Sequence, residues 1–247
     1  MTERPPEGAD VPHRRRVMAG VFDVDGVLLA SPHERAWREA LIGYAPPREF
    51  TTALYQAEVA GKPRLDGARA ALRALGVADA DRRAGAYAVA KQVKLEALIC
   101  AGAVKAFPDA LRLVEALGAL GAPLAVASSS KNANQMMRPI RLASGQGLLS
   151  AFKANVCGRD LKRGKPDPEI FLLAAEELGV EPRDCFVAED APAGIEAARA
   201  AGMTALGVAR LGDAGPLRAG GADLVVTTLD EIAIDGLAEG RLWSRDP

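Results

Sequence analysis

Two carboxylates separated by one residue follow the first apolar run of the sequence, in Phe22-Asp23-Val24-Asp25-Gly26-Val27. Burying acids at the end of an apolar segment costs free energy, so their presence there indicates a function. The pair offers a nucleophilic carboxylate beside a general acid or base. Gly26 can adopt the unusual backbone angles with which a chain leaves a strand. A plain strand-to-loop turn with hydrated acids is the alternative interpretation.

Three serines, a lysine and an asparagine occur together in Ala127-Ser128-Ser129-Ser130-Lys131-Asn132, between a predicted strand and a predicted helix. Hydroxyls and backbone N–H groups at the start of a helix form an anion site, to which Lys131 adds positive charge. A helix N-cap by one serine or asparagine is the alternative, but it explains a single residue of this group.

A lysine stands just before a predicted helix in Gly164-Lys165-Pro166-Asp167-Pro168, where Pro168 would start the helix. The ammonium group of Lys165 can hold a phosphoryl oxygen and offset the charge of nearby carboxylates. Taken by itself, the segment is better explained as the surface start of a helix. Its meaning therefore depends on the other segments.

A second pair of acids ends a predicted buried strand in Val187-Ala188-Glu189-Asp190-Ala191-Pro192-Ala193-Gly194-Ile195. Hard oxygen ligands in this position suit Mg²⁺, which binds a few carboxylates together with water and substrate phosphate. An N-cap by Asp190 for the following helix is the alternative.

The elements that position these segments follow from the hydrophobic pattern, which changes at about residue 33 and again after residue 107. Strands are predicted over residues 17–22, 122–128, 152–158, 185–189, 204–210 and 222–228. Helices are predicted between these strands over residues 108–121, 132–142, 167–180 and 193–202. Between residues 32 and 103 only helices are predicted, over residues 33–44, 51–60, 66–75 and 80–102.

This order predicts an α/β fold with a doubly wound, Rossmann-like parallel sheet and an inserted all-helical cap. We expect a flexible arm over residues 1–16, a catalytic core over 17–31 and 104–247, and the cap over 32–103. An insertion after the first strand lies over the carboxyl ends of the strands, where open α/β sheets bind ligands. All four segments are expected at that edge.

The composition excludes several classes of protein. The chain has 247 residues and a formal net charge of -1, so no strong field steers it toward nucleic acid or an anionic membrane. Its three cysteines are widely spaced, which argues against a disulfide framework and a zinc site and predicts buried residues in a reducing compartment. We find no signal-peptide pattern and no apolar stretch of about twenty residues, and expect a cytoplasmic monomer or weak dimer.

The four segments resemble the motifs of the haloacid dehalogenase (HAD) superfamily, in their order and over nearly the whole chain after the arm. The resemblance implies that Asp23 attacks phosphorus and that Asp25 first protonates the leaving group and then activates the acceptor. Ser128 and Lys165 would hold the transferring phosphoryl group. An acid at position 25 is typical of the phosphatases and phosphomutases of the superfamily rather than its dehalogenases.

The same resemblance implies a Mg²⁺ cofactor. Its ligands would be the carboxylates of Asp23 and Asp190 and the backbone carbonyl of Asp25, and Glu189 would support the site. Metal, lysine and N–H groups would then stabilise the charge of the phosphoryl group during its transfer.

Within the superfamily the chain is most similar to the β-phosphoglucomutase subgroup with its helical cap. The similarity rests on the segments His33-Glu34-Arg35-Ala36-Trp37, Gly61-Lys62-Pro63-Arg64 and Lys91-Gln92. It implies that Arg64 and Ser130-Lys131-Asn132 hold the phosphate that is not transferred, and that Lys91, or Lys94 in its place, contacts the sugar phosphate. The implied substrate-binding residues are Gly61, Arg64, Lys91, Ser129, Ser130, Lys131, Asn132 and His33.

Each cap residue also has a simpler structural role open to it. Arg64 and Lys91 lie among many solvated charges, Trp37 fits a hydrophobic core, and His33 fits the first turn of a helix. The hinge segment 28–32 is also about two residues shorter than the resemblance implies and lacks its Asp-Thr/Ser pair. That difference bears on cap closure.

Three functions are compatible with the sequence. The first hypothesis is a sugar-phosphate mutase that acts on a small phosphorylated metabolite. The second is a phosphatase with the same nucleophile, in which water replaces the sugar as acceptor. Water access to the aspartyl-phosphate distinguishes these two. The third is a non-catalytic regulator that binds phosphate or Mg²⁺, which the complete set of acids and the large cap argue against.

Overall fold

The computed structural model describes residues 18–212 and 214–245, and six of its strands form one parallel sheet in the order β5-β4-β1-β6-β7-β8. These strands are β1 (Ala19–Phe22), β4 (Leu124–Val126), β5 (Ala154–Asn155), β6 (Cys185–Glu189), β7 (Thr204–Val208) and β8 (Leu224–Val226). All six were predicted, and each observed strand is shorter than the range predicted for it, except β6, which has the predicted bounds. The arm expected over residues 1–16 lies outside the described residues.

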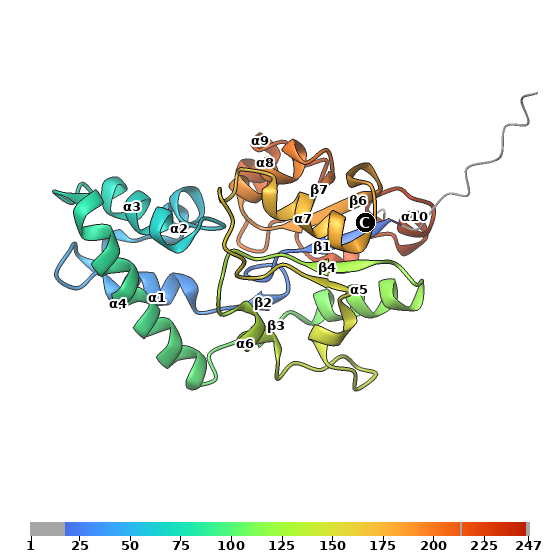
Figure 1. Ribbon diagram of the computed structural model, residues 1–247, viewed down its shortest axis with the longest axis horizontal. Helices are drawn as coiled ribbons and strands as arrows, with labels where there is room; N and C mark the ends of the chain where they lie inside the picture. Colours follow the sequence, from blue (N-terminus) through green and yellow to red (C-terminus); the bar gives the residue numbers. More distant parts are fainter. Residues whose placement is uncertain (1–17, 213, 246–247) are drawn as a thin grey trace, which may run out of the picture.

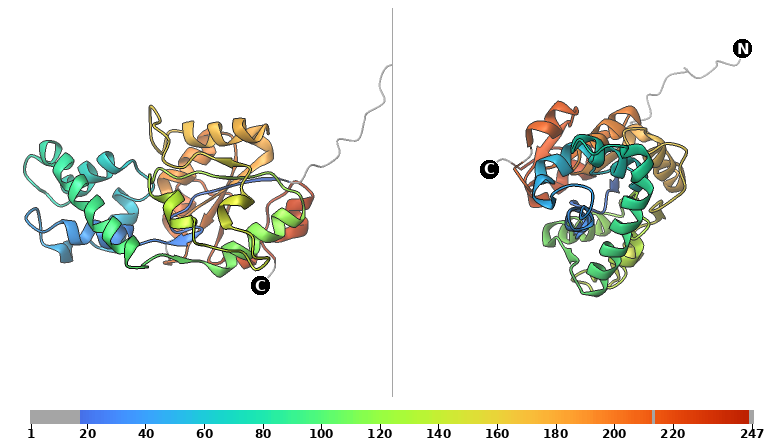
Figure 2. Two further views of the ribbon diagram at one scale, coloured as in Figure 1. Left: turned by 60° about the horizontal axis from the view of Figure 1, so that its bottom comes forward. Right: turned by 90° about the vertical axis from the view of Figure 1, so that its left-hand side faces the viewer.

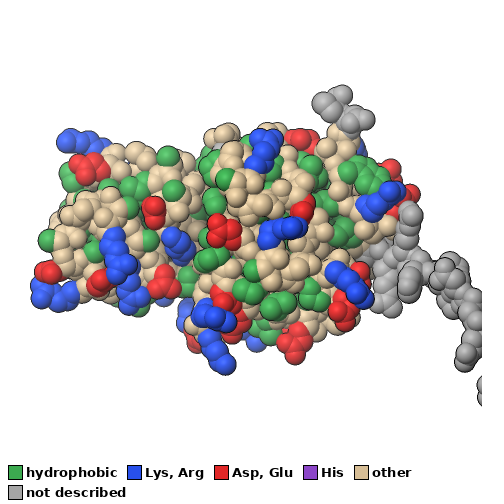
Figure 3. Space-filling view, turned by 90° about the horizontal axis from the view of Figure 1, so that it is seen from above, with side chains coloured by type: hydrophobic (Ala, Val, Ile, Leu, Met, Phe, Trp, Pro, Cys, Tyr) green, Lys and Arg blue, Asp and Glu red, His purple; other side chains and the backbone are tan. Residues whose placement is uncertain are grey.

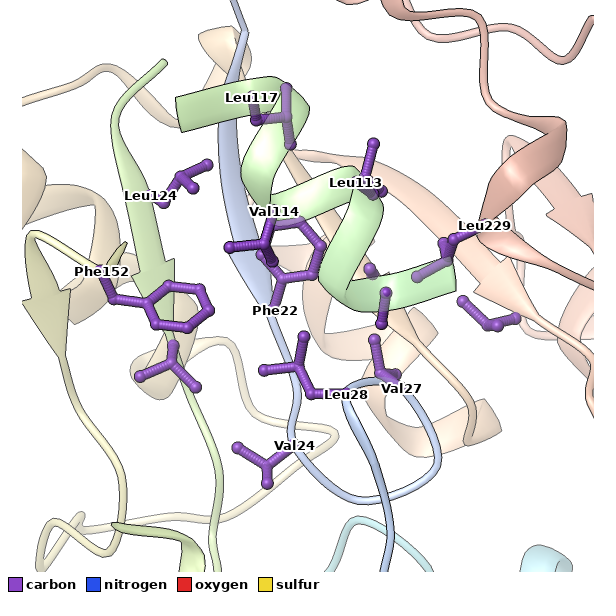
Figure 4. Packing of buried hydrophobic residues seen from close by; sticks show 14 of the residues in the cluster. Phe22, Val24, Val27, Leu28, Leu113, Val114, Leu117, Leu124, Phe152 and Leu229 are labelled. Atoms are coloured by element: carbon purple, nitrogen blue, oxygen red, sulfur yellow. The ribbon is translucent and has the colours of Figure 1, made fainter. Parts of the chain in front are cut away.

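Successive side chains along each strand enter two different hydrophobic clusters, as the twofold period of a strand requires. In β1, Phe22 packs in one cluster and Val21 in the other. Figure 4 shows the first cluster, where Phe22 faces Val114 and Leu117 of α5 (Pro108–Ala119). Because both faces are covered, most residues of the strands are apolar.

Helices cover both faces of the sheet, which produces three layers (Figure 1). On the first face lie α5, α6 (Ala133–Met137), α10 (Ile234–Ala238) and the 3-10 turns η2 (Leu148–Ala151) and η4 (Leu229–Glu231). On the second face lie α7 (Glu169–Leu178), α8 (Pro192–Ala200) and α9 (Ala214–Ala219), and η3 (Pro182–Asp184) leads into β6.

Four helices form a separate cap that is joined to the core through two antiparallel strands, β2 (Leu29–Ala30) and β3 (Lys105–Ala106). The cap contains α1 (His33–Ala40), η1 (Pro47–Glu49), α2 (Thr52–Glu58), α3 (Arg64–Ala74) and α4 (Ala80–Cys100). It has its own hydrophobic cluster, centred on Trp37, Leu72 and Tyr87. Figure 2 shows the cap standing beyond one end of the sheet.

Three details differ from the sequence predictions. The helix predicted over 132–142 ends at Met137, because Pro139 lacks an N–H and restricts the residue before it. Cys100 is exposed, so the prediction of buried cysteines was wrong for that residue and right for Cys185. The two hinge strands were not predicted, since two residues are too few to produce a hydrophobic period.

The surface seen from above carries interspersed acidic and basic side chains rather than an area of one sign (Figure 3). This agrees with the formal net charge of -1. Within the described residues, no helix has the length and apolar character of a membrane span.

Candidate active site

The carboxyl ends of β1 and β6 bring two of the predicted acids to one buried lysine. Lys165 Nζ lies 2.6 Å from Asp23 Oδ1 and also donates to Glu189 Oε1. All three side chains are buried, and Glu189 is held further by the backbone N–H groups of Asp190 and Ala191. The parallel pairing of β1 with β6 causes this convergence, because Asp23 and Glu189 follow adjacent strand positions.

Burial and charge act against each other in this cluster. Burial would lower the pKa of Lys165, but the charges of Asp23 and Glu189 outweigh it and raise that pKa above its usual value. Burial raises the pKa of Glu189 to about 7 and also raises the pKa of Asp23, and the charge of Lys165 opposes both shifts. The three groups therefore depend on one another for their ionised forms.

Asp190 lies against the turn that follows Asp25. A Cβ on Gly26 would stand 1.9 Å from Asp190 Oδ2, and φ is +75° at Gly26, so only glycine fits there. Gly194 likewise leaves room for Glu189, whose carboxyl carbon would lie 2.0 Å from an added Cβ. Burial, followed by the charges of Glu189 and Asp23, raises the pKa of Asp190 well above its usual value.

The turn carrying Asp25 is held from the core by Arg210, a residue that the sequence analysis did not identify. Arg210 donates to the carbonyls of Gly26 and Val27, at 3.0 Å each, and to Asp109 Oδ2 at 2.9 Å. Its guanidinium also stacks on Phe107, which precedes α5. Arg210 therefore fixes the backbone of the two residues that follow Asp25.

Asp25 faces the cap through His33. The Oδ2 atom of Asp25 lies 3.5 Å from His33 Nε2, and His33 Nδ1 lies 2.9 Å from Lys91 Nζ. Burial, and then the charge of Lys91, lowers the pKa of His33 well below its usual value, which favours the neutral imidazole. Burial raises the pKa of Asp25, and the Ser31 hydroxyl and the two lysines counteract part of that shift.

Lys91 is the buried lysine of the cap. Burial lowers its pKa to about 7, and Nζ stands 5.0 Å from the centre of the Trp37 ring. The alternative candidate, Lys94, is exposed and does not line the cavity described below. Trp37 is both a core residue of the cap and part of the cavity wall.

The cap and the core touch at the serine-rich loop. Ser129 Oγ donates to the Gly61 carbonyl at 3.2 Å, and the Gln92 amide exchanges hydrogen bonds of 3.0 and 3.3 Å with Asn132. Within the loop, the Ser128 hydroxyl accepts from the N–H of Ser130. These contacts set the width of the space between the two parts.

That space is a cavity of about 240 Å³ between the cap and the carboxyl ends of the strands. All the predicted site residues line it except Lys165, which donates to Asp23, and Glu189, which accepts from Lys165. Its predicted lining residues are Asp23, Asp25, His33, Gly61, Arg64, Lys91, Ser128, Ser129, Ser130, Lys131, Asn132 and Asp190.

Two predicted cations of the cavity differ in their surroundings. Lys131 is exposed and paired with Asp160 at 2.6 Å, so its charge is already balanced. Arg64 begins α3 at the cavity wall and has no ion-pair partner within residues 18–212 and 214–245. Arg159 and Asp160 also line the cavity, and the sequence analysis missed both because they lie in a loop without a recognisable pattern.

The cluster of four carboxylates is suited to a divalent cation. Asp23, Asp25, Glu189 and Asp190 lie around one lysine. Burial is the main cause of the raised pKa of each acid, and neighbouring carboxylates raise the pKa of Asp23, Glu189 and Asp190 further. No three His, Cys, Asp or Glu side chains of the described residues form a metal site by themselves. The implied ligand set is compatible with that result, because one of its members is a backbone carbonyl.

The fold is that of a known class. The model of the haloacid dehalogenase-like hydrolase family matches residues 17–202, and the chain belongs to that family. The resemblance and the fold class expected from the sequence are thereby confirmed.

Relatives within the family narrow the class to phosphoryl transfer. The chain is 35% identical to the β-phosphoglucomutase of Mycobacterium tuberculosis over 88% of its length and 92% of that protein. It is 36% identical to the fructose-1-phosphate phosphatase of Escherichia coli, over 76% of this chain and 94% of that protein. The crystal structure of a β-phosphoglucomutase from Pyrococcus matches with a TM-score of 0.71 and 29% sequence identity. The match covers 90% of this chain and 97% of that one. The chain is an enzyme of this phosphotransferase and hydrolase type.

Proposed function

We propose that this enzyme is a sugar-phosphate mutase that works through an aspartyl-phosphate on Asp23. The observation that carries the proposal is the distribution of positive charge around the cavity. Lys165 lies on the core side beneath Asp23, whereas Arg64 and Lys91 line the cap side. A sugar bisphosphate has a phosphate for each side, and a mutase must bind such an intermediate in two orientations.

The residues divide the chemistry between them. Asp23 Oδ attacks the phosphorus of the substrate, the bond from phosphorus to the leaving oxygen breaks, and Asp25 supplies that oxygen with a proton. The phosphoryl group then passes from Asp23 to a sugar hydroxyl, whose proton Asp25 accepts. The raised pKa of Asp25 favours the protonated form that the first step needs. Lys165 and the Ser128 hydroxyl would hold the phosphoryl oxygens.

Magnesium, when bound, would neutralise charge on the transferring phosphoryl group. Asp23, Asp190 and the Asp25 carbonyl would hold it, and Glu189 would fix the segment through the N–H of Asp190. Exhaustive chelation should abolish turnover, and added Mg²⁺ should restore it. Calcium should inhibit, because its looser coordination orients the nucleophile poorly. Full activity after chelation would end this assignment.

The helical cap, which we assign to residues 32–103, would close on the second phosphate and exclude bulk water. Binding energy from that remote phosphate would then orient the acceptor hydroxyl. Gly61, Ser129, Ser130 and Asn132 lie where the two parts meet. These residues would therefore form the contacts between cap and core when the cap closes.

A panel of hexose 1-phosphates with a trace of the corresponding bisphosphate tests the proposal. Isomer formation that exceeds release of inorganic phosphate is the expected result. Phosphate release without isomer would favour the second candidate, a sugar phosphatase, which the relative from Escherichia coli supports. If neither product forms with any sugar phosphate, the assigned substrate class is wrong.

A further inference from the structure

The turn that follows Asp25 receives two hydrogen bonds from Arg210, which lies two residues beyond the end of β7. Its Nε and Nη2 atoms donate to the carbonyls of Gly26 and Val27 at 3.0 Å each. No other donor to these two carbonyls is found among the described residues. A guanidinium is planar and donates in fixed directions, so two bonds to consecutive carbonyls hold the turn in one orientation.

The guanidinium of Arg210 is in turn anchored to the core by Asp109. Its Nη1 atom donates to Asp109 Oδ2 at 2.9 Å, and the two side chains are only 13% and 7% exposed. The same oxygen accepts from the Thr228 hydroxyl at 2.8 Å and from the Leu229 N–H at 2.7 Å. Burial would raise the pKa of Asp109, but its hydrogen bonds, that from Arg210 foremost, lower this pKa below its usual value. Asp109 is therefore a charged support for Arg210 that is held by further donors of the core.

Arg210 also contacts the segment by which the chain returns from the cap. The guanidinium carbon lies 3.8 Å from the centre of the Phe107 ring, and Phe107 directly follows β3. The N–H of Phe107 donates to the carbonyl of Leu28, the residue before β2. The two crossings between core and cap thus lie side by side at Arg210, and the turn that follows Asp25 begins the first of them.

The carboxyl group of Asp25 depends on its backbone for its position. Its Oδ1 atom is buried without a hydrogen-bond partner among the described residues, and its Oδ2 atom lies 3.5 Å from His33, which belongs to the cap. A contact to the cap would change when the cap opens or closes, whereas the hydrogen bonds from Arg210 come from the core. The core thus holds this turn independently of the cap.

We infer that Arg210 is a positioning residue for the proton transfers of Asp25, because it keeps the turn of this acid in place against the hinge. The inference rests on the proposed function, in which Asp25 protonates the leaving oxygen as the bond from that oxygen to phosphorus breaks. Arg210 does not line the cavity between cap and core, so it acts through the turn and not on the substrate. Its loss is expected to slow proton transfer and to leave substrate binding intact.

A set of substitutions separates positioning from general disruption of the fold. Arg210→Met removes both bonds to the turn, and Arg210→Lys offers one nitrogen in place of a fork. Asp109→Asn removes the charge that anchors Arg210 but leaves its donors to the turn in place. Arg218→Met is the matched control, because Arg218 is an exposed arginine of α9 that does not line the cavity. Asp25→Asn is the reference for loss of the acid itself, and thermal melting shows which variants are folded.

The measurement compares a leaving group that needs a proton with one that does not. A hexose leaves as an alkoxide unless an acid protonates it, whereas para-nitrophenolate leaves without that help. In Arg210→Met, kcat for isomer formation from a hexose 1-phosphate with trace bisphosphate should fall roughly 10-fold to 100-fold, and KM should change by less than about twofold. The rate of the first-turnover burst of para-nitrophenolate from its phosphate ester should change by less than about twofold.

The other variants should fall in a definite order. The loss of kcat in Arg210→Lys should be smaller than in Arg210→Met, because one contact to the turn can be kept. Asp109→Asn should lower the melting temperature with less effect on kcat than Arg210→Met. Arg218→Met should match the unaltered enzyme in both assays.

Each contrary outcome has a definite meaning. Equal loss of both rates in folded Arg210→Met overturns the inference, because it shows disruption of the whole site, and so does unchanged isomer formation. A loss in Asp109→Asn as large as that in Arg210→Met also overturns it, because the bonds to the turn are then not what matters. If Arg210→Met does not fold, Arg210→Lys is judged by the same criteria. Should Asp25→Asn fail to lower isomer formation selectively, the proposed role of Asp25 is wrong and the inference falls with it.

Discussion

Two buried lysines on opposite sides of the cavity have opposite electrostatic environments. Lys165, in the core, is 3% exposed and contacts two carboxylates, which raise its pKa. Lys91, in the cap, is 2% exposed and faces the neutral ring of His33, and burial lowers its pKa to about 7. Equal burial therefore produces opposite shifts, and the partner decides the sign.

The difference indicates how the two halves are used. The core half is balanced before substrate arrives, because Lys165 already has Asp23 and Glu189 as partners. The cap half carries Lys91 and Arg64 without an ion-pair partner in the described residues. An incoming phosphate dianion would supply the missing charge and raise the pKa of Lys91. Substrate binding is thus expected to balance the charge of the cap half, because the charge of the core half already has partners.

The largest effect is expected from Asp23→Asn, which removes the nucleophilic charge of the core and keeps its shape. Turnover of sugar phosphates should fall by about 10³-fold or more, since no other group replaces a covalent nucleophile. Steady-state assays with a melting curve measure this, and Asp235→Asn, an exposed acid in α10, is the control. Substantial residual activity would exclude covalent catalysis through Asp23.

Replacing each lysine by methionine tests the comparison directly. Lys165→Met leaves two buried carboxylates without their cation and should cost about 3–5 kcal/mol of unfolding free energy. Lys91→Met should cost less than about 1 kcal/mol or stabilise the free enzyme, because no buried charge loses its partner. Urea unfolding at pH 7 measures both, with the exposed Lys105→Met as control. Equal destabilisation by the two changes would refute the proposed asymmetry.

Arg64→Ala should reduce isomer formation by roughly 100-fold, because a bidentate contact to the second phosphate is lost. Slow hydrolysis of an aryl phosphate, which has no second phosphate, should remain nearly unchanged. Arg48→Ala, an exposed arginine of the cap outside the cavity, is the control. Equal loss on both substrates would indicate a structural role for Arg64. No loss on either would favour a phosphatase with other cap contacts.

The pH dependence of stability should also separate the lysines. The pKa of Lys91 is about 7 in the folded chain and 10.5 in its usual environment, so the unfolded chain binds more protons between these values. The stability of the unaltered protein relative to Lys91→Met should therefore rise from pH 7 to pH 10. The contribution of Lys165, whose folded pKa is raised, should stay constant below its usual pKa of 10.5. A flat difference for Lys91 would contradict its assigned environment.

The smallest effect is expected from Lys131→Ala. Exposed ion pairs contribute little, and Asp160 already balances this lysine, so isomer formation should change by only about twofold to fivefold. The same substrate panel measures it, with Arg48→Ala again as control. A loss as large as that of Arg64→Ala would show that the pair with Asp160 breaks when substrate binds.

The sequence signals are more specific in the core half of the candidate site than in the cap half. Asp23, Asp25, Glu189 and Asp190 each follow a short apolar run directly, and parallel strands bring their carboxyl ends to one edge. Such signals are local. The choice between Lys91 and Lys94 was open in the sequence, because both stand on one long helix whose charged face resembles a solvated one.

The elements were predictable to the extent that they follow a period. The six strands of the sheet are short, mostly apolar runs and the long helices repeat about every 3.6 residues, so local sequence patterns indicate both. The β2–β3 hinge, α9 and α10 are too short for such a pattern, and α6 is cut short at Met137. The network of Arg210 with Gly26, Val27 and Asp109 joins residues far apart in the chain, so no local signal announces it.

By itself the sequence determined the class of chemistry, because acids placed directly after buried apolar strands cost free energy that a catalytic role accounts for. Only the tertiary structure decided the surroundings of the cations near the candidate site. It paired Lys131 with Asp160, buried Lys91 against His33 and left Lys94 exposed. It also brought Arg210 to the turn that follows Asp25. Burial and pairing arise from contacts between distant segments, and these contacts set the charge that each group carries.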